Sequence, residues 1–454
     1  MVIAATTKVS LGGALKPVTA LLIGTALLYL GYGLQTTLVP LRAEAEGFSQ
    51  ITIGLLGAAY YGGFVVGCLF APYVIMRAGH IRAFAAMVSC VSAAALVFPL
   101  AVGEVQWLVF RFLVGACISI VLVIVESWLN EKSSAETRGA VMSTYIIITY
   151  GAITVGQLGV TTQPLDGFAL FSLCSILLSV AAVPVALTRA TQPAPIPSVQ
   201  FRPGHLWHLA PAAFVGAFAS GLMIGSVLSL SAVFAVGSGF TTGEAAVLAS
   251  AVVLGGALGQ YPFGRTSDYL DRRLVLLVSA GASVTLAIFL MAASAMSFTM
   301  VVSLGFAFGF VTLPSYSLAA AHAYDWTEPH DLVEVSAGMN LLFGAGSTVG
   351  PVMASVAMIV MGPSGLFLVA AIAAGGLGVF IGLRILVRRR PADAIRTDFD
   401  LYATAALGAV VPGEIEELVV SSDDSDDDDV AAEPATVDTA PAEADMKLET
   451  EKAD

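Results

Sequence analysis

Charge is scarce in this sequence. Charged residues make up 12% of the 454 positions, whereas hydrophobic residues make up 57% and the mean hydropathy is +0.87. No water-soluble domain has this composition. The net charge of −13 comes from one end, since residues 391–454 hold 19 acidic and 3 basic residues and the first 390 hold 14 and 17. A body without a basic face excludes a nucleic-acid-binding protein.

Signatures of catalysis and of ATP hydrolysis are also missing. No glycine directly precedes a lysine, which excludes a Walker-type phosphate loop, and neither HExxH nor GxSxG occurs. The cysteines are few and lie in apolar runs without CxxC spacing, which favours buried thiols over a metal site. They are Cys68, Cys90, Cys117 and Cys174. We therefore expect no enzyme activity, no catalytic residue, no metal and no cofactor.

What the chain has in abundance is long apolar runs. A helix crosses the hydrocarbon core of a lipid bilayer with about 20 residues, whereas the strands of a barrel need only about 10 alternating ones. Twelve runs of helical length predict an all-α membrane protein with twelve transmembrane helices. The predicted spans are 17–41, 51–76, 83–103, 105–128, 139–163, 167–188, 206–236, 244–264, 274–295, 297–323, 333–361 and 363–387.

Lysine and arginine gather at alternate ends of these runs, as cytoplasmic loops require. The ends predicted to face outside carry only Arg42. The ends predicted to face inside carry Lys8, Lys16, Arg77, Arg82, Lys132, Arg138, Arg189, Arg202, Arg265, Arg272, Arg273, Arg384 and Arg388–Arg390. This asymmetry predicts a multi-pass protein of the cell inner membrane with both termini in the cytoplasm.

The twelve spans divide into two sets of six. Residues 189–205 include the proline-rich stretch Gln192–Pro197, which cannot be helical and is typical of a linker. An offset near 192 residues superimposes glycines of the second and eighth spans, namely Gly62, Gly63 and Gly67 on Gly255, Gly256 and Gly259. The pattern predicts two pseudo-symmetric six-helix bundles, 1–188 and 206–390, with a cavity between them at mid-membrane.

The C-terminal segment 391–454 differs in composition from the rest. Its acidic run Asp423–Asp429 is followed by Ala, Pro, Glu and Thr, and such a segment buries too little apolar surface to become ordered. We expect a disordered acidic cytoplasmic tail. Two roles stay open for it: a solvated end, or a binding segment for a basic protein partner.

The stretch Gly264–Arg273 has a glycine, an aspartate and paired basic residues between two spans. It resembles motif A of the major facilitator superfamily. The glycine permits close helix approach, the carboxylate can face the N-terminal end of another helix, and the arginines hold the loop at the inner surface. The resemblance implies an inner gate built from Gly264, Arg265, Asp268, Arg272 and Arg273. A positively charged loop without a gating role is the alternative.

The corresponding loop of the first half is degraded, because Met76 occupies the position where the superfamily usually has aspartate. An acid for a gate on that side must come from elsewhere in the chain. Glu126, at the cytoplasmic end of the fourth span, is the nearest candidate. We therefore expect an ion pair between Arg77 and Glu126.

The fourth span contains Arg111 four residues before Gly115, and Leu108–Gly115 resembles motif B of the superfamily. At 1.5 Å per residue Arg111 lies roughly 10 Å inside the outer boundary. A membrane-embedded arginine costs about 3 kcal/mol or more, so it should face the bundle interior. We expect Arg111 to contact an anionic group of the substrate or to modulate a proton site. A structural hydrogen bond to helix carbonyls is the alternative.

Further stretches refine this resemblance. Gly346–Pro351 is similar to motif C, but it lies in the eleventh span rather than the fifth, which disfavours proton-coupled exchange. Glu126–Asn130 with Arg138 and Gly139, and Leu313–Asp325, resemble the bacterial YcaD-like subgroup. The resemblance covers about residues 17–390 and implies the superfamily fold and a transport role, without a defined cargo.

Polar and aromatic residues near mid-span are the candidates for a substrate cavity. They are Tyr29, Tyr32, Gln35, Arg111, Tyr150, Gln157, Ser226, Ser315 and Tyr316. No aspartate or glutamate lies deep in a span, although a proton pathway normally needs an ionisable group there. A coupling proton, carried by Glu126 or His322, stays open beside uniport and exchange.

We interpret the chain as a secondary active or facilitative transporter of a small solute. The two bundles would rock about the central cavity to give alternating access. The alternative is a non-transporting membrane sensor or assembly factor on the same fold, whose acidic tail engages a partner. Deleting the tail separates the two, since only the second function requires it.

Overall fold

The computed structural model describes residues 15–133, 135–188, 203–328 and 331–387. Within these ranges the chain forms helices joined by short turns and contains no β-strand. Most of the predicted linker and the whole acidic tail lie outside the described residues. The same is true of Lys8, Arg189, Arg202 and Arg388–Arg390.

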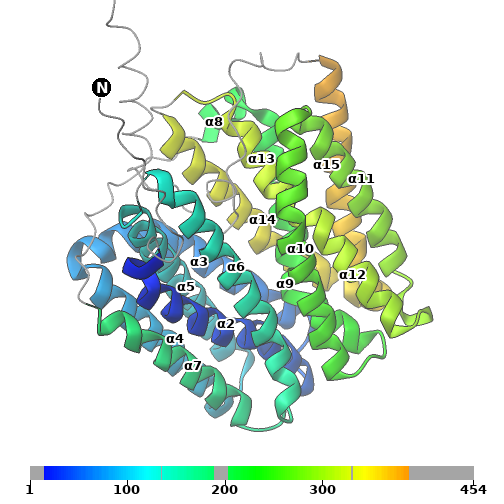
Figure 1. Ribbon diagram of the computed structural model, residues 1–454. Helices are drawn as coiled ribbons and strands as arrows, with labels where there is room; N and C mark the ends of the chain where they lie inside the picture. Colours follow the sequence, from blue (N-terminus) through cyan, green and yellow to red (C-terminus); the bar gives the residue numbers. More distant parts are fainter. Residues whose placement is uncertain (1–14, 134, 189–202, 329–330, 388–454) are drawn as a thin grey trace, which may run out of the picture.

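The first six long helices form the N-terminal bundle, coloured blue to teal in Figure 1. They are α2 (Thr19–Ala45), α3 (Gln50–Ala78), α4 (His80–Leu100), α5 (Glu104–Glu131), α6 (Ala135–Leu158) and α7 (Ala169–Ala186). Their ends carry local signals of the sequence. The Ser49 hydroxyl caps α3 by accepting from the Thr52 N–H at 3.1 Å, and Gly79 turns the chain between α3 and α4 at φ 76°.

The C-terminal bundle contains the next six spans. Its helices are α9 (Pro211–Gly237), α10 (Thr242–Tyr269), α11 (Arg272–Leu290), α12 (Phe298–Thr312), α13 (Pro314–Tyr324), α14 (Leu332–Met361) and α15 (Gly365–Val387). The predicted span 206–236 starts too early. Its first residues belong to the short helix α8 (Pro203–Leu209), and a new helix begins at Pro211. The tenth span consists of α12 and α13 because Pro314 opens a new helix.

The described residues contain the expected number of transmembrane helices. Eleven helical stretches of the described chain are long and apolar enough to cross a membrane, and the last of them, Glu334–Val387, contains both α14 and α15. These two helices separate at Gly362, whose φ of 70° breaks the helical path. When α14 and α15 are counted as separate helices, the described part of the chain has twelve such spans, which confirms the all-α membrane fold.

Large apolar side chains cover the outside of the bundles. Leu69, Ile147 and Val379 are each 60% or more exposed, on α3, α6 and α15. Water disfavours so much exposed apolar surface, whereas lipid tails solvate it. These surfaces agree with a protein embedded in a lipid bilayer.

Glycines make the same close helix contact in both bundles. A Cβ at Gly63 of α3 would lie 2.8 Å from the Phe112 carbonyl carbon of α5. A Cβ at Gly255 of α10 would lie 3.0 Å from the Phe306 carbonyl carbon of α12. The two positions are 192 residues apart, which is the offset that aligns the halves of the sequence. Close packing between backbones therefore explains why the repeat conserves glycine spacing.

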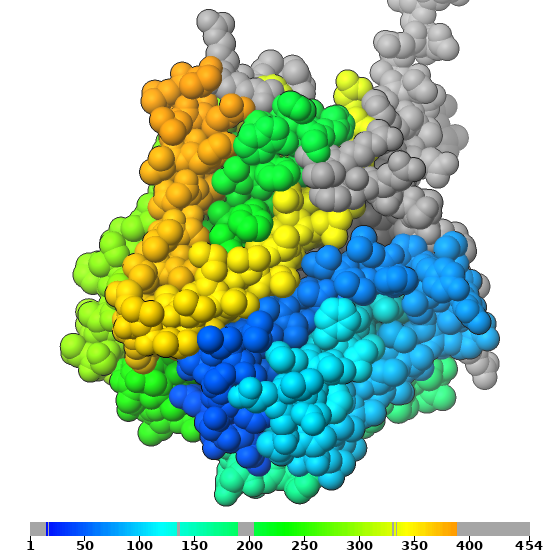
Figure 2. Space-filling model, turned by 180° about the vertical axis from the view of Figure 1, so that it is seen from behind, coloured from blue at the N-terminus to red at the C-terminus, as the bar shows by residue number. Residues whose placement is uncertain are grey.

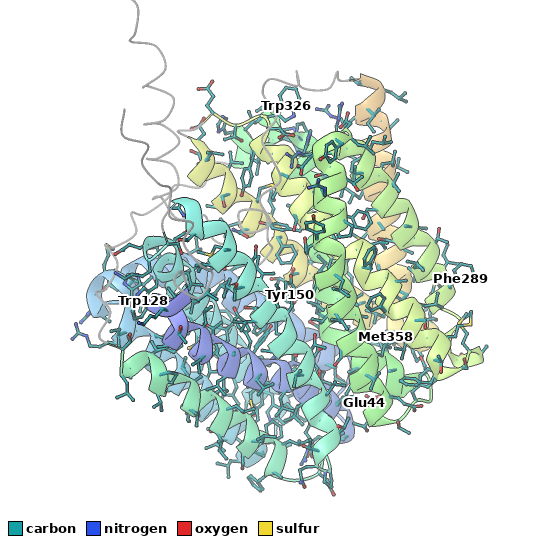
Figure 3. The ribbon with its side chains drawn as sticks, in the orientation of Figure 1. Glu44, Trp128, Tyr150, Phe289, Trp326 and Met358 are labelled. Carbon is teal, nitrogen blue, oxygen red and sulfur yellow. The ribbon has the colours of Figure 1, made fainter. Side chains whose placement is uncertain are left out.

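The two bundles meet along α3 and α14 and along α6 and α10. Figure 2 shows the yellow α14 lying against the blue α3. The amide of Gln50 contacts the Met358 sulfur at 3.5 Å, and the Ser250 hydroxyl donates to the Thr154 carbonyl oxygen at 3.1 Å. Figure 3 shows Met358 below the middle of the view and Glu44 lower still. These contacts join the bundles at the end that the sequence predicts to face outside.

Candidate functional site

A cavity lies between the bundles, with about 960 Å³ of empty space that is partly open to solvent. Both bundles contribute to its wall, through helices α2, α3, α5, α6, α9, α10 and α14 and the junction of α12 with α13. In Figure 3, Tyr150 on α6 marks the middle of the molecule, where α6 faces α10. The aromatic lining consists of Tyr32, Tyr60, Tyr61, Phe64, Tyr150 and Phe343. The site is thus predominantly aromatic and apolar.

Arg111 brings the charge to this cavity. Its side chain comes from α5 and is only 5% exposed. Its Nε donates to the Leu56 carbonyl oxygen at 3.4 Å, and the guanidinium carbon lies 4.7 Å from the centre of the Tyr60 ring. Within the described residues Nη1 is buried and has no hydrogen-bond acceptor. No acidic side chain stands among the described residues that line the cavity. The arginine is therefore held by a carbonyl and a ring rather than by a counterion.

Four of the nine residues predicted for the cavity line it in this structure. They are Tyr32, Arg111, Tyr150 and Gln157. The other five lie in helix contacts around the cavity. Tyr29 packs edge-on against the Tyr32 ring at 6.0 Å, and Tyr316 donates to the Asn340 side-chain oxygen at 2.8 Å.

The remaining three of the five are also buried between helices. Ser226 donates to the Leu222 carbonyl oxygen at 2.6 Å, and Ser315 exchanges a hydrogen bond with Ser220 at 2.8 Å. Gln35 is fully buried on α2. All five are buried but do not line the cavity, because a mid-span position alone does not determine which face of its helix a residue occupies.

Sequence reasoning missed the side of α3 that faces Arg111. Tyr60, Tyr61 and Phe64 line the cavity together with Phe343 of α14 and Leu313. Tyr60 and Phe64 are four residues apart, which places them on one helix face. The Tyr60–Tyr61 pair stands next to Gly62 and Gly63 in the span that packs closely on α5. The position of Tyr60 and Tyr61 beside these glycines was the sequence feature that could have identified them as cavity residues.

The motif A residues of the second half form a buried ion-pair cluster. Arg272 lies 3.9 Å from the Asp268 carboxylate, and its Nε lies 2.9 Å from the Asp325 carboxylate at the end of α13. The side chains of Arg272 and Asp325 are 1% and 2% exposed, whereas that of Asp268 is 24% exposed. Asp325 is thus a partner that the motif alone did not reveal. The cluster ties the turn between α10 and α11 to α13.

The other residues of this turn hold the start of α11. Asp271 caps α11, accepts from the Arg273 N–H at 2.9 Å and pairs with the Arg273 guanidinium at 2.8 Å. Partial burial raises the pKa of the Asp271 carboxyl, but the hydrogen bonds from Arg273 outweigh this effect and hold that pKa below its usual value. Gly264 is buried in α10, and the Arg265 guanidinium lies 5.7 Å from the Tyr269 ring centre.

The predicted ion pair between Arg77 and Glu126 does not form in this structure. Arg77 is exposed and its guanidinium contacts the Tyr73 hydroxyl at 3.4 Å. Glu126 is fully buried and accepts a hydrogen bond from the Tyr145 hydroxyl at 3.3 Å. The Arg77 side chain is therefore at the surface, whereas that of Glu126 is enclosed between helices. Proximity to the same membrane surface was not sufficient to bring them together.

Twelve apolar helices in two bundles around a shared cavity define a multi-pass membrane protein with a central binding cavity. Two family models match this chain, the Major Facilitator Superfamily over residues 213–412 and the Sugar (and other) transporter family over residues 9–191. The chain resembles transporters of the major facilitator superfamily, and among them the YcaD-type transporters. The matched families and relatives are transporters rather than enzymes.

Curated relatives and solved structures agree with this assignment. The MFS-type transporter YcaD of Escherichia coli (strain UMN026) is 28% identical over 345 residues, which cover 76% of this chain and 89% of YcaD. YcaD of Shigella flexneri matches equally. The nucleoside transporter NupG superimposes with a TM-score of 0.61 at 13% identity, over 82% of this chain and all of NupG. A bacterial homologue of the lysosomal transporter Spinster has a TM-score of 0.61 at 15% identity, over 83% and 98%. At these identities the structures establish the fold alone.

Among the described residues no group of three His, Cys, Asp or Glu side chains could hold a metal ion. The four cysteines are free, and Cys174 is buried against α2, where its thiol contacts the Gly31 carbonyl oxygen at 3.2 Å. The cavity offers groups that can recognise a ligand. A positive charge, phenol hydroxyls and aromatic faces are its recognition groups.

Proposed function

We propose that this transporter moves its small solute by alternating access, with the two bundles rocking about the central cavity. The observation that supports this proposal most directly is that side chains of both bundles line one cavity, with Arg111 in its wall. A solute bound there contacts both bundles, so relative rotation of the bundles exposes it to one side at a time. The proposal places the protein in the cell inner membrane with both termini cytoplasmic.

The domain boundaries belong to the same proposal. Residues 1–188 and 206–390 form the two bundles, 189–205 the cytoplasmic linker and 391–454 the acidic tail. Coupling to a proton is an option within this mechanism. Glu126 is fully buried and His322 is 6% exposed, and these two titratable groups are our candidates for it.

The direct test is a comparison of metabolites inside and outside cells that make the wild-type protein, the Arg111→Ala variant at matched membrane abundance, or no protein. We expect at least one compound to differ between wild type and the empty cells, and Arg111→Ala to reduce that difference. A chain truncated after residue 390 should transport as well as the full chain. If no compound differs under any of several nutrient conditions, the protein is not a transporter of small solutes in these cells.

A second prediction concerns the inner gate that we propose for Gly264, Arg265, Asp268, Arg272 and Arg273. Asp268→Asn should slow transport by up to about 5-fold, because a partly exposed ion pair at 3.9 Å contributes at most about 1 kcal/mol. The midpoint of thermal unfolding should fall by no more than about 2 °C, because Arg272 keeps its closer contact with Asp325. Initial rates of solute movement in membrane vesicles give the readout. Rates equal to wild type would remove Asp268 from the gate.

A further inference from the structure

We propose that the solute is an organic monoanion with a flat, largely apolar body, such as an aromatic monocarboxylate, whose anionic group binds Arg111. This inference rests on the proposed function and specifies the substrate class of the same cavity. It follows from three observations: an uncompensated charge, the aromatic wall, and a second unpartnered polar group at the site.

Arg111 is a buried cation that lacks a counterion on the described lining of the cavity. A guanidinium is always protonated and carries five N–H donors. In this structure Nε has one long hydrogen bond, Nη1 has no acceptor among the described residues, and the charge rests against the Tyr60 ring. A buried cation without a counterion is strongly unfavourable, and an anion that enters the cavity supplies what is missing. The two oxygens of a carboxylate can accept two parallel hydrogen bonds from a guanidinium.

The lining of the cavity also limits the charge of the solute to one. Arg111 is the single cationic side chain among the described residues that line the cavity. A dianion would bring one more negative charge into the low-dielectric site than the site can neutralise. A cationic solute would meet Arg111 without any acidic residue on the described lining, and a neutral solute would leave the arginine uncompensated. A monoanion is the class that this lining favours.

The wall of the cavity indicates the nature of the uncharged part of the solute. The centre of the Tyr60 ring lies 5.8 Å from that of Tyr32 and 5.2 Å from that of Tyr61. These three rings form one aromatic surface, and the Arg111 guanidinium lies over its Tyr60 ring. Phe343 of α14 and Leu313 approach from the C-terminal bundle. Aromatic walls accept a flat ring by stacked or edge-on contacts, which add to the gain from apolar burial. The proposed ring would therefore be held by side chains of both bundles.

A further polar group is available on α6. Gln157 lines the cavity, is 3% exposed, and its side-chain oxygen has no donor among the described residues. An amide that can accept and donate discriminates among solutes by the hydroxyl or N–H group that they carry. A solute with a donor group on its body, such as a phenol or an indole N–H, would satisfy Gln157 as well.

The test uses the purified full chain in lipid nanodiscs and measures the midpoint of thermal unfolding against the concentration of each probe, since binding to the folded state raises that midpoint. The probes are 4-hydroxyphenylacetate and indole-3-acetate, each paired with its primary amide, together with acetate, chloride and the dianion terephthalate. We expect the two acids to bind the wild type at least about 10-fold more tightly than their amides, as for the loss of a hydrogen bond to a charged group.

Variants assign the effect to one side chain. Arg111→Gln should remove the preference for acid over amide, and Arg111→Lys should retain part of it because the charge stays while the fork is lost. Arg82→Gln is the matched control, since Arg82 is exposed at the start of α4 and donates to the Ala78 carbonyl oxygen. It should keep the wild-type preference. Equal folding of the variants is checked by the midpoint without probe.

Several results would overturn the inference. These are equal binding of acids and amides, stabilisation by acetate or chloride to the same extent, tighter binding of terephthalate, an acid preference that survives Arg111→Gln, or no stabilisation by either acid. In each case the metabolite comparison still decides the proposed function by itself. A transported neutral or cationic solute there would mean that transport is right and the monoanion is wrong.

Discussion

Gly54→Ala is expected to lower transport by about 10-fold or more without unfolding the protein. A Cβ at Gly54 of α3 would lie 2.7 Å from the Pro351 carbonyl oxygen of α14 and closer still to the Ser355 side chain. That obstacle is backbone of the other bundle, so the bundles must separate at their predicted outer end. Overpacking of this kind costs about 1–3 kcal/mol, and 1.36 kcal/mol is a factor of ten in population.

The matched control is Gly62→Ala on the same helix. A Cβ there would meet only the Thr348 methyl at 3.9 Å, which is ordinary contact. The measurement needs no known solute: in a variant without the four native cysteines, Ser229→Cys in the cavity wall is labelled from outside with a membrane-impermeant maleimide. Gly54→Ala should speed this labelling and Gly62→Ala should leave it unchanged. Equal labelling in both would mean that the contact between α3 and α14 does not close the outer path.

Asp325→Asn is expected to destabilise the protein by about 3–5 kcal/mol. The substitution leaves Arg272 charged in a site where the two side chains are 1% and 2% exposed and lie 2.9 Å apart. Removing the closer partner of this buried ion pair leaves Arg272 with the partly exposed Asp268 carboxylate at 3.9 Å, which compensates the buried charge only weakly and so accounts for the size of the effect. The midpoint of thermal unfolding and the abundance in the membrane measure it.

Asp268→Asn serves as the control for Asp325→Asn, because it neutralises the other carboxylate near Arg272, which lies at the longer distance of 3.9 Å. Combining Arg272→Met with Asp325→Leu should recover part of the lost stability, since apolar residues replace both charges. If Asp325→Asn and Asp268→Asn lower the midpoint equally, the cluster is a loose surface network rather than a buried pair.

Arg111 shows how far a sequence can lead toward a functional site. Its position in an apolar run already implies a partner or a cavity, because lipid does not solvate a guanidinium. The structure adds the groups that contact Arg111 from another helix, namely the Tyr60 ring and the Leu56 carbonyl oxygen. Tyr29 and Tyr32 make the same point on α2. Both lie at mid-span, but only Tyr32 lines the cavity.

The gate residues divide in the same way. Motif A identified Arg272 and Asp268, which are four residues apart on one turn. Asp325 is more than fifty positions further along the chain, and only folding brings it to Arg272. Arg77 and Glu126 are the opposite case. They share a predicted membrane surface, but one side chain is exposed and the other is buried.

The sequence by itself determined the class of this protein, the twelve spans and the glycine repeat. The bilayer is a solvent that demands apolar segments of one length, and close helix packing demands glycine at a fixed spacing. Only the tertiary structure decided which residues face the cavity and which charges meet. Those features depend on the rotation of each helix against neighbours that are distant in the chain, and no local pattern encodes that rotation.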